Sequence, residues 1–184
     1  MDNKKISVTD LVFKKFDAGF DLIPLNSFMS DGNDPVLRKA PPVNSYPDFE
    51  KFLSFNLATV FHDFYVILDK KIRNIVGYAY SYEFRLNDGH CKLFVWLKEG
   101  YKKEFLQPLF MQFSHMLLSA YSFRKLYLEC VINEDTDLEE YKSLGFCLEG
   151  VLKENFYKDK EFRNLAILSI CRDKVDDYFK KMQG

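Results

Sequence analysis

Short stretches of apolar, aromatic and β-branched residues recur along the chain, separated by polar turns. This pattern predicts strands over residues 11–16, 64–68, 75–82, 91–97, 126–132, 146–156 and 165–171. Charged residues at 69–74 and the turn signal Asn87-Asp88-Gly89 join three of these strands closely. Residues 64–97 are therefore expected to form an antiparallel meander.

Apolar residues at helical spacing predict four helices, over residues 17–28, 47–57, 109–120 and 138–144. Pro47 and Pro108 suit a first helical turn, and Gly145 suits a C-terminal cap. Residues 30–47 read as a loop. The order β-α-α-β-β-β-α-β-α-β-β indicates an α/β fold (of the α+β kind), a mixed sheet with helices on its faces.

Composition narrows the class of protein. The 184 residues are 47% hydrophobic, and 19 Phe, 11 Tyr and 1 Trp exclude a disordered chain. The length fits a single domain over residues 1–184. A net charge of -1 argues against nucleic acid as a partner. No apolar run is long enough to span a membrane, and the polar start leads into no signal peptide, so we expect a cytoplasmic protein.

The four cysteines are far apart and show no metal-ligand spacing. Three of them, Cys91, Cys130 and Cys171, lie in or beside apolar runs, where free cysteine behaves as a small hydrophobic residue. We therefore expect buried thiols, with neither disulfides nor a bound metal.

The segment Tyr141-Lys142-Ser143-Leu144-Gly145-Phe146, followed by Glu149-Gly150, resembles a motif of the GNAT acyltransferase superfamily. The branch it is most similar to is the Rim type, which acetylates N-termini of ribosomal proteins. Further similarity at residues 64–82, 126–133 and 152–169 extends the resemblance over residues 11–172. It implies a mostly antiparallel sheet whose fourth and fifth strands splay apart, with helices on both faces.

The resemblance also implies a reaction: direct transfer of acetyl from acetyl-CoA to a primary amine, without a metal. Tyr141 matches the general acid of the family, and Glu83 or Glu129 lies on the right element for the general base. The residues expected to contact acetyl-CoA are Phe94, Val95, Trp96, Leu97, Lys98, Gly100, Tyr101, Lys102, Lys103 and Asn133. Glu134, rather than Asn133, occupies the gapless family position.

The phosphate-binding loop can be aligned in two registers. In the first, Gly100-Tyr101-Lys102-Lys103-Glu104 stands for the family's G-Y-G-T-E, with Lys102 at the second glycine and Leu97 at the preceding Arg or Gln. In the second, the helix begins near Pro108 and residues 97–107 form a longer loop. In either register, Lys98, Lys102 and Lys103 would act as point charges near the phosphates of acetyl-CoA.

Two functions of different classes follow. The first is an N-acetyltransferase acting on a protein N-terminus or a small-molecule amine. The second is a non-catalytic binding module with a degenerate pyrophosphate loop, which Leu97, Lys102 and Pro108 favour. Asp31 and Asp34, in the 30–47 loop, are placed to attract a cationic acceptor. An exposed strand edge or the aromatic surplus could support a homodimer.

Overall fold

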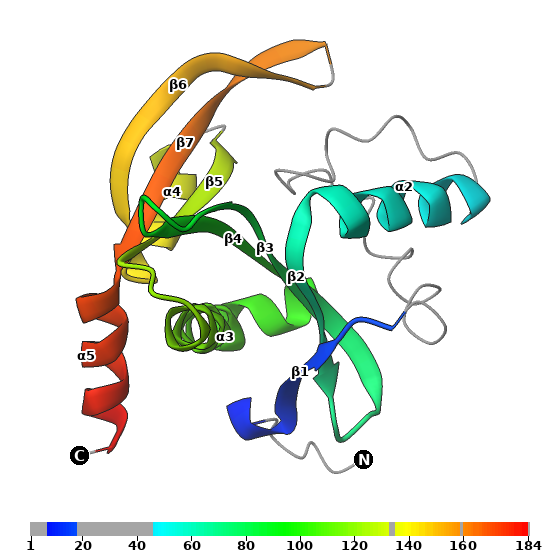
Figure 1. Cartoon of the computed structure of the whole chain (residues 1–184), viewed down its shortest axis with the longest axis vertical. Coiled ribbons are helices and arrows are strands. Elements are labelled where there is room, and N and C mark those ends of the chain that lie inside the picture. The colour runs from blue at the N-terminus through cyan, green and yellow to red at the C-terminus, as the bar shows by residue number, and fades with distance from the viewer. Residues whose placement is uncertain (1–6, 18–45, 133–134, 159, 184) are drawn as a thin grey trace.

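A computed structural model describes residues 7–17, 46–132, 135–158 and 160–183 (Figure 1). Among them, seven strands form one sheet in the order β1-β2-β3-β4-β5-β7-β6, antiparallel except for β4 beside β5. The strands are β1 (Leu11–Lys15), β2 (Phe61–Asp69), β3 (Asn74–Arg85), β4 (His90–Leu97), β5 (Lys125–Ile132), β6 (Cys147–Lys158) and β7 (Glu161–Cys171). The predicted meander and mixed sheet are confirmed. The helix expected at 17–28 and the 30–45 part of the loop, with Asp31 and Asp34, lie outside the described residues, apart from Asp17.

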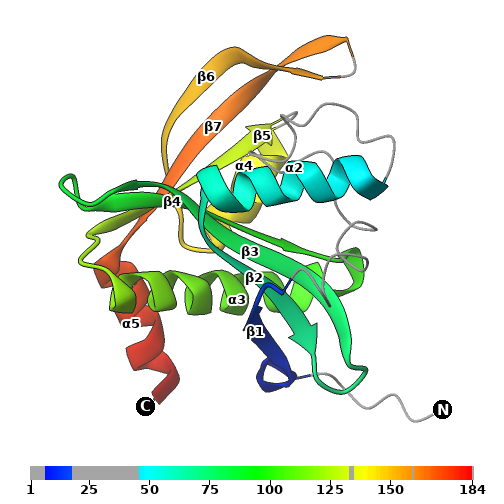
Figure 2. The ribbon, with the colours of Figure 1, turned by 45° about the vertical axis from the view of Figure 1, so that its right-hand side comes forward.

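Helices cover both faces of the sheet, as expected (Figures 1 and 2). Besides a short 3-10 helix, η1 (Val8–Asp10), they are α2 (Tyr46–Thr59), α3 (Glu99–Ala120), α4 (Asp135–Ser143) and α5 (Arg172–Gln183). Phe113 of α3 packs on Phe13 and Tyr65, with ring centroids 5.6 and 5.9 Å away. Phe64, next to Tyr65, points to the opposite face, where α2 lies. No helix within the described ranges is long and apolar enough to cross a membrane.

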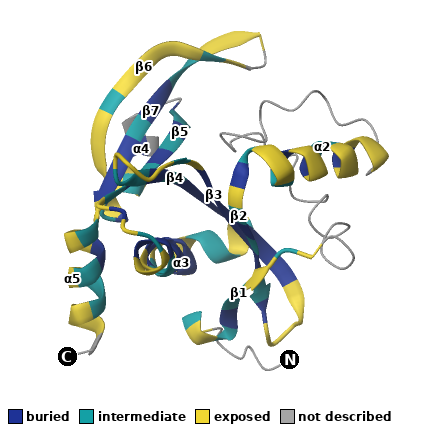
Figure 3. Cartoon of the chain, in the orientation of Figure 1, coloured by how far each residue is buried: buried dark blue, intermediate teal, exposed yellow. Residues whose placement is uncertain are grey.

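Most of the aromatic residues form the core. Tyr78 and Tyr80 are buried on β3, and their rings contact Phe64 of β2 and Phe94 of β4. Figure 3 shows the buried positions concentrated on β2, β3, β4 and α3, while most of β6 is exposed. The aromatic surplus is therefore mainly a matter of packing.

The start of α3 differs from the prediction. The helix begins at Glu99, directly after β4, and Pro108 lies inside it instead of in its first turn. A proline removes one helical hydrogen bond, to the carbonyl of Glu104, which is an exposed residue. Buried Phe105, Leu106, Leu109 and Phe110 on both sides of the proline keep the helix against the sheet. Packing therefore outweighs the local preference of proline.

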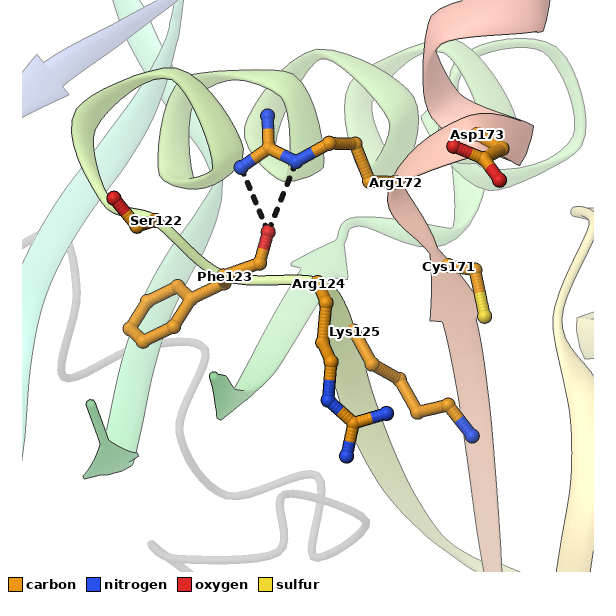
Figure 4. A pocket seen from close by; sticks show the side chains of 7 residues that line it. All are labelled: Ser122, Phe123, Arg124, Lys125, Cys171, Arg172 and Asp173. Atoms are coloured by element: carbon orange, nitrogen blue, oxygen red, sulfur yellow. Dashed lines mark hydrogen bonds between the residues drawn. The ribbon is translucent and has the colours of Figure 1, made fainter. Parts of the chain in front are cut away.

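The C-terminal helix α5 was not predicted. Val175 is fully buried, and Tyr178 and Phe179 pack against the core at helical spacing from it. Arg172, the first residue of α5, donates hydrogen bonds from its guanidinium to the carbonyls of Leu118, Tyr121 and Phe123, at 2.7–3.2 Å. Figure 4 shows the two bonds to Phe123. Arg172 thereby satisfies carbonyls at and just after the end of α3, which no intrahelical donor reaches.

All four cysteines are free, as expected. Cys91 and Cys130 are buried, but Cys147 and Cys171 are exposed. The expectation of a buried thiol, made for Cys91, Cys130 and Cys171, is thus wrong for Cys171. Cys171 is the last residue of β7, where the strand leaves the core for α5.

Candidate active site

The parallel pair β4 and β5 separates partway along its length. His90, Cys91 and Lys92 pair with Lys125, Leu126 and Tyr127, and no further pairs join the two strands within the described residues. Beyond this point β4 stays paired with β3 and β5 stays paired with β7. Residues 93–97 and 128–132 therefore face each other without pairing as strands, and an extended ligand can lie between them. The predicted splay is confirmed.

A charged network lies where the strands separate. The ammonium of Lys92 is 2.6 Å from a carboxylate oxygen of Glu83 and 2.7 Å from one of Glu129. The Tyr82 hydroxyl donates a hydrogen bond of 3.4 Å to Glu129, and its ring lies 5.7 Å from the Lys92 nitrogen. The structure thus brings the two candidate bases, Glu83 and Glu129, together through Lys92, which contacts both.

The electrostatics of this network follow from burial and pairing. Burial alone would lower the pKa of Lys92, but hydrogen bonds to Glu129 and Glu83 outweigh it, and the pKa is raised. The side chain of Glu129 is 12% exposed and that of Glu83 is 50% exposed. Glu129 is therefore the enclosed carboxylate and Glu83 the one open to solvent.

A bulge in β3 directs Glu83 toward the network. The β3–β4 register shifts after Tyr82, and Glu83 has a φ of 48°, in the left-handed region. Upstream of the bulge, Tyr82 lies opposite Lys92, Tyr80 opposite Phe94 and Tyr78 opposite Trp96. The network therefore continues a row of buried aromatic residues on one face of the sheet.

The residues expected at the phosphate loop lie in the first turns of α3. Lys98 is the N-cap, and Glu99, Gly100, Tyr101, Lys102 and Lys103 follow in the helix. This geometry contradicts the register with a longer loop ending near Pro108. A Cβ built on Gly100 would meet no atom within 4 Å, so the fold itself does not require glycine here. Lys102 forms an ion pair of 2.8 Å with Glu99.

Tyr101 turns toward the β2–β3 connection. Its hydroxyl donates a hydrogen bond of 3.0 Å to Asp69, a fully buried carboxylate. Burial, and then the interaction with Asp69, raise the pKa of Tyr101 to about 12. On β4, the side chains of Phe94, Val95, Trp96 and Leu97 are buried, so these residues can offer a ligand chiefly their backbone.

Tyr141 lies on α4, half-buried, with its ring edge-on to Phe110 of α3 at 6.4 Å. Helix α4 ends as the sequence predicts. Gly145 has a φ of 97° and donates to the carbonyl of Lys142, while Phe146 donates to that of Tyr141. This cap fixes the last turn of the helix, which carries Tyr141. Asn133 and Glu134 lie outside the described residues.

Sequence reasoning missed Lys92, Tyr82 and Asp69. The signal for Lys92 was present, because it is the one charged residue within the apolar run 91–97. A lysine in such a strand needs a counter-charge, and two candidate carboxylates lie on neighbouring strands. Asp69 gave no such signal, since it occupies an ordinary turn position after a strand.

Comparison with known proteins agrees with this geometry. Residues 21–164 match the family model described as the acetyltransferase (GNAT) domain. No curated protein matches the chain.

Among solved structures, spermidine N-acetyltransferase SpeG from Vibrio cholerae, in complex with CoA and spermine, has a TM-score of 0.73 at 17% identity. The alignment covers 91% of this chain and 98% of that one. A chimera of Vibrio cholerae SpeG and hSSAT gives the same TM-score and identity, with 91% and 99% covered. These relatives do not test the narrower resemblance to the Rim branch. The family match and the splayed sheet lead to the same conclusion: this chain belongs to the GNAT acetyltransferases.

Proposed function

We propose that the chain is an acetyl-CoA-dependent N-acetyltransferase that transfers acetyl directly to a primary amine. The observation that carries the proposal is the carboxylate network of Glu129, Glu83 and Lys92 at the point where β4 and β5 separate. Two strand edges that face each other without pairing, next to an enclosed carboxylate, combine a place for an extended amide ligand with a proton acceptor.

The residues present fit acetyl-CoA along most of its length. The facing edges of residues 93–97 and 128–132, which do not pair with each other, suit the amides of pantetheine. Lys98, Lys102 and Lys103 supply positive charge near the N-terminus of α3. When bound, acetyl-CoA would supply an activated acyl thioester. A backbone N–H of β4 would stabilise negative charge on the carbonyl oxygen.

We assign the general base to Glu129. An alkylammonium acceptor has a pKa of about 10, so it must lose a proton before it can attack. Glu129 is the less exposed carboxylate, and its contacts with Lys92 and Tyr82 fix its position. Glu83, half exposed, would attract the cationic acceptor. Tyr141 would donate a proton to the leaving sulfur.

For the acceptor, we favour a small-molecule amine over a protein N-terminus. With Lys92 between them, the two carboxylates leave a net single negative charge, and the half-exposed Glu83 can face a cationic amine. The solved relatives are named for spermidine, a molecule of this kind.

One observation favours the second candidate, a GNAT-fold binding module without transferase activity. Helix α3 follows β4 directly, and its first turn carries the carboxylate of Glu99. A negative charge at a helix N-terminus opposes phosphate binding there, whereas a glycine-rich loop would favour it.

Calorimetric titration with acetyl-CoA, followed by transfer assays with spermidine and with an unblocked peptide, separates these functions. We expect micromolar binding and faster transfer to spermidine. Glu129→Gln and Tyr141→Phe should each lower kcat at least about a hundredfold while acetyl-CoA still binds. Glu139→Gln, an exposed carboxylate on α4, is the matched control and should match the wild type. If acetyl-CoA does not bind at millimolar concentration, the transferase proposal is wrong and the non-catalytic binding module is the better description. If the peptide is acetylated faster than spermidine, the acceptor is a protein N-terminus instead of a small-molecule amine.

A further inference from the structure

A cavity lies on the opposite face of the sheet from the charged network. It has a volume of about 510 Å³ and lies between β2 and the C-terminal half of α3. Consecutive strand residues point to opposite faces, so Tyr82 belongs to the candidate active site while its neighbour Ser81 points the other way. Ser81 contacts Asp63, which lines this cavity. The two sites are therefore separated by the sheet itself.

The cavity contains one enclosed negative charge. The side chain of Asp63 is 16% exposed, and its Oδ2 accepts hydrogen bonds from Ser81 at 3.2 Å and from Tyr121 at 3.4 Å. Over the part of the chain that the structure describes, no lysine or arginine pairs with Asp63. Asp63 lies 3.7 Å from Nδ1 of His62, whose side chain is half exposed. A carboxylate in such a place is stabilised by a cation.

The charge of Asp63 also acts on neighbouring groups. Burial first, and then the Asp63 charge, raise the pKa values of Tyr65 and Tyr121 and bring the pKa of the Cys91 thiol to about 12. These three groups therefore stay uncharged at neutral pH. They leave a single negative charge facing the cavity.

The remaining walls suit an organic cation. The rings of Tyr65, Phe113 and Tyr121 line the cavity together with the thioether of Met116. Aromatic faces attract ammonium groups, and quaternary ammonium ligands are bound by clusters of such rings. A hard metal ion would instead need about six oxygen ligands. The volume is within the range of small-ligand pockets.

We propose that this cavity binds a compact organic cation, an alkylammonium or quaternary ammonium group, with its charge beside Asp63 and its alkyl groups against the three rings. This site is independent of acetyl transfer. It requires neither acetyl-CoA nor the network around Lys92.

Choline and its uncharged isostere 3,3-dimethyl-1-butanol test the proposal on the intact chain. Choline should bind at millimolar concentration or better, at least about tenfold more tightly than the alcohol, because both fill the same volume and only choline carries a charge. Methyl NMR of labelled methionine locates the ligand. The Met116 signal should shift, while that of exposed Met182 should not. Equal binding of the two compounds, or no Met116 shift, would overturn the proposal without any variant.

Two variants then test which carboxylate binds the ammonium group of choline. Asp63→Asn keeps the shape and an oxygen acceptor for Ser81 and Tyr121, and should weaken choline at least about tenfold. Glu129→Gln, in the candidate active site, should leave choline binding unchanged. The opposite result, with choline sensitive to Glu129 and not to Asp63, would move the cation to the acceptor groove and refute the second site. Circular dichroism confirms that each variant is folded.

Discussion

Single side chains at the candidate site divide between chemical and structural roles. Tyr101 shows this best. It was expected to contact acetyl-CoA, but its hydroxyl donates a hydrogen bond to the buried carboxylate of Asp69. The carboxylate of Asp69 also accepts from the backbone N–H of Lys71 at 2.8 Å. Asp69 thus fixes both the β2–β3 turn and the Tyr101 ring, and the Tyr101 hydroxyl is already engaged within the fold.

We expect Tyr101→Phe to lower the free energy of unfolding by about 1–3 kcal/mol, since a buried acceptor loses its partner. Acetyl-CoA affinity should stay within about twofold of the wild type. Urea unfolding and calorimetry measure the two quantities. Tyr157→Phe, at an exposed tyrosine, is the control and should change neither. If Tyr101→Phe leaves the free energy of unfolding unchanged but greatly weakens acetyl-CoA binding, the hydroxyl contacts acetyl-CoA and has no structural role.

At the scale of single elements, the end of helix α4 depends on one particular residue, Gly145. Helix α4 ends at Ser143 and is capped by Gly145, which has a φ of 97°. The same cap positions the turn that carries Tyr141. A Cβ at this position would also lie 3.0 Å from the terminal methyl of Met111. The cap therefore needs glycine mainly for its backbone conformation.

Gly145→Ala should destabilise the fold by about 1–2 kcal/mol, because L-residues other than glycine are strained at this φ. Gly150→Ala is a matched control, with open space around the added methyl. Thermal unfolding of both variants checks the difference. Equal melting temperatures would show that the cap tolerates a side chain.

Helices α3 and α5 meet through Arg172, whose guanidinium serves three backbone carbonyls. We expect Arg172→Met to lower the free energy of unfolding by about 2–3 kcal/mol, since these carbonyls lose a charged donor. Because its partners are neutral, the loss should persist at high salt. Lys174→Met, at an exposed position of α5, should have little effect. Chemical denaturation at low and high salt tests both, and an effect that salt abolishes would point to ion pairing.

The sequence pattern predicted the strands of the meander, β5, β7 and α4 well. Strand β5 alternates between buried and partly buried positions, and β3 and β4 are apolar or aromatic runs that are buried along most of their length. The pattern failed at the start of α3, where the charged stretch Lys98-Glu99 and Pro108 hid a helix stabilised by packing. It also failed at α5, where Val175, Tyr178 and Phe179 are diluted by charges. Of the site, Glu83 and Glu129 were found from the resemblance. Their link through Lys92 depends on contacts between strands, which no local pattern contains.

On the scale of the whole molecule, the sheet consists of two parts joined by a narrow seam. Strands β1 to β4 form one part and β5 to β7 the other, and three register pairs join them. The ion pair between Lys92 of β4 and Glu129 of β5 also crosses this seam. Lys92 therefore connects the two parts of the fold as well as the two candidate carboxylates.

Lys92→Met should reduce the free energy of unfolding by about 2 kcal/mol at pH 8, because Glu129 loses a buried counter-charge. The folded-state pKa of Lys92 is raised, so its contribution is complete below the ordinary lysine value of 10.5 and is lost as pH rises through the folded value. The difference between wild type and variant should therefore shrink above about pH 10.5.

Urea unfolding at pH 8 and pH 11 measures this difference. Lys102→Met, which breaks the ion pair of Lys102 with exposed Glu99, should cost less than about 0.5 kcal/mol at pH 8. If Lys92→Met costs as little unfolding free energy as Lys102→Met, or if its cost does not change with pH, then Lys92 is not a stabilising counter-charge for Glu129.

The separation of β4 from β5 also determines how the groove can change through mutation. Its polar groups belong to the main chain, whereas the side chains of Phe94, Val95, Trp96 and Leu97 are buried. Substitutions among these residues alter packing but leave every N–H and C=O in place. Only proline deletes a donor. A lineage can therefore exchange apolar side chains of similar volume along this strand and still inherit the backbone groups that face β5.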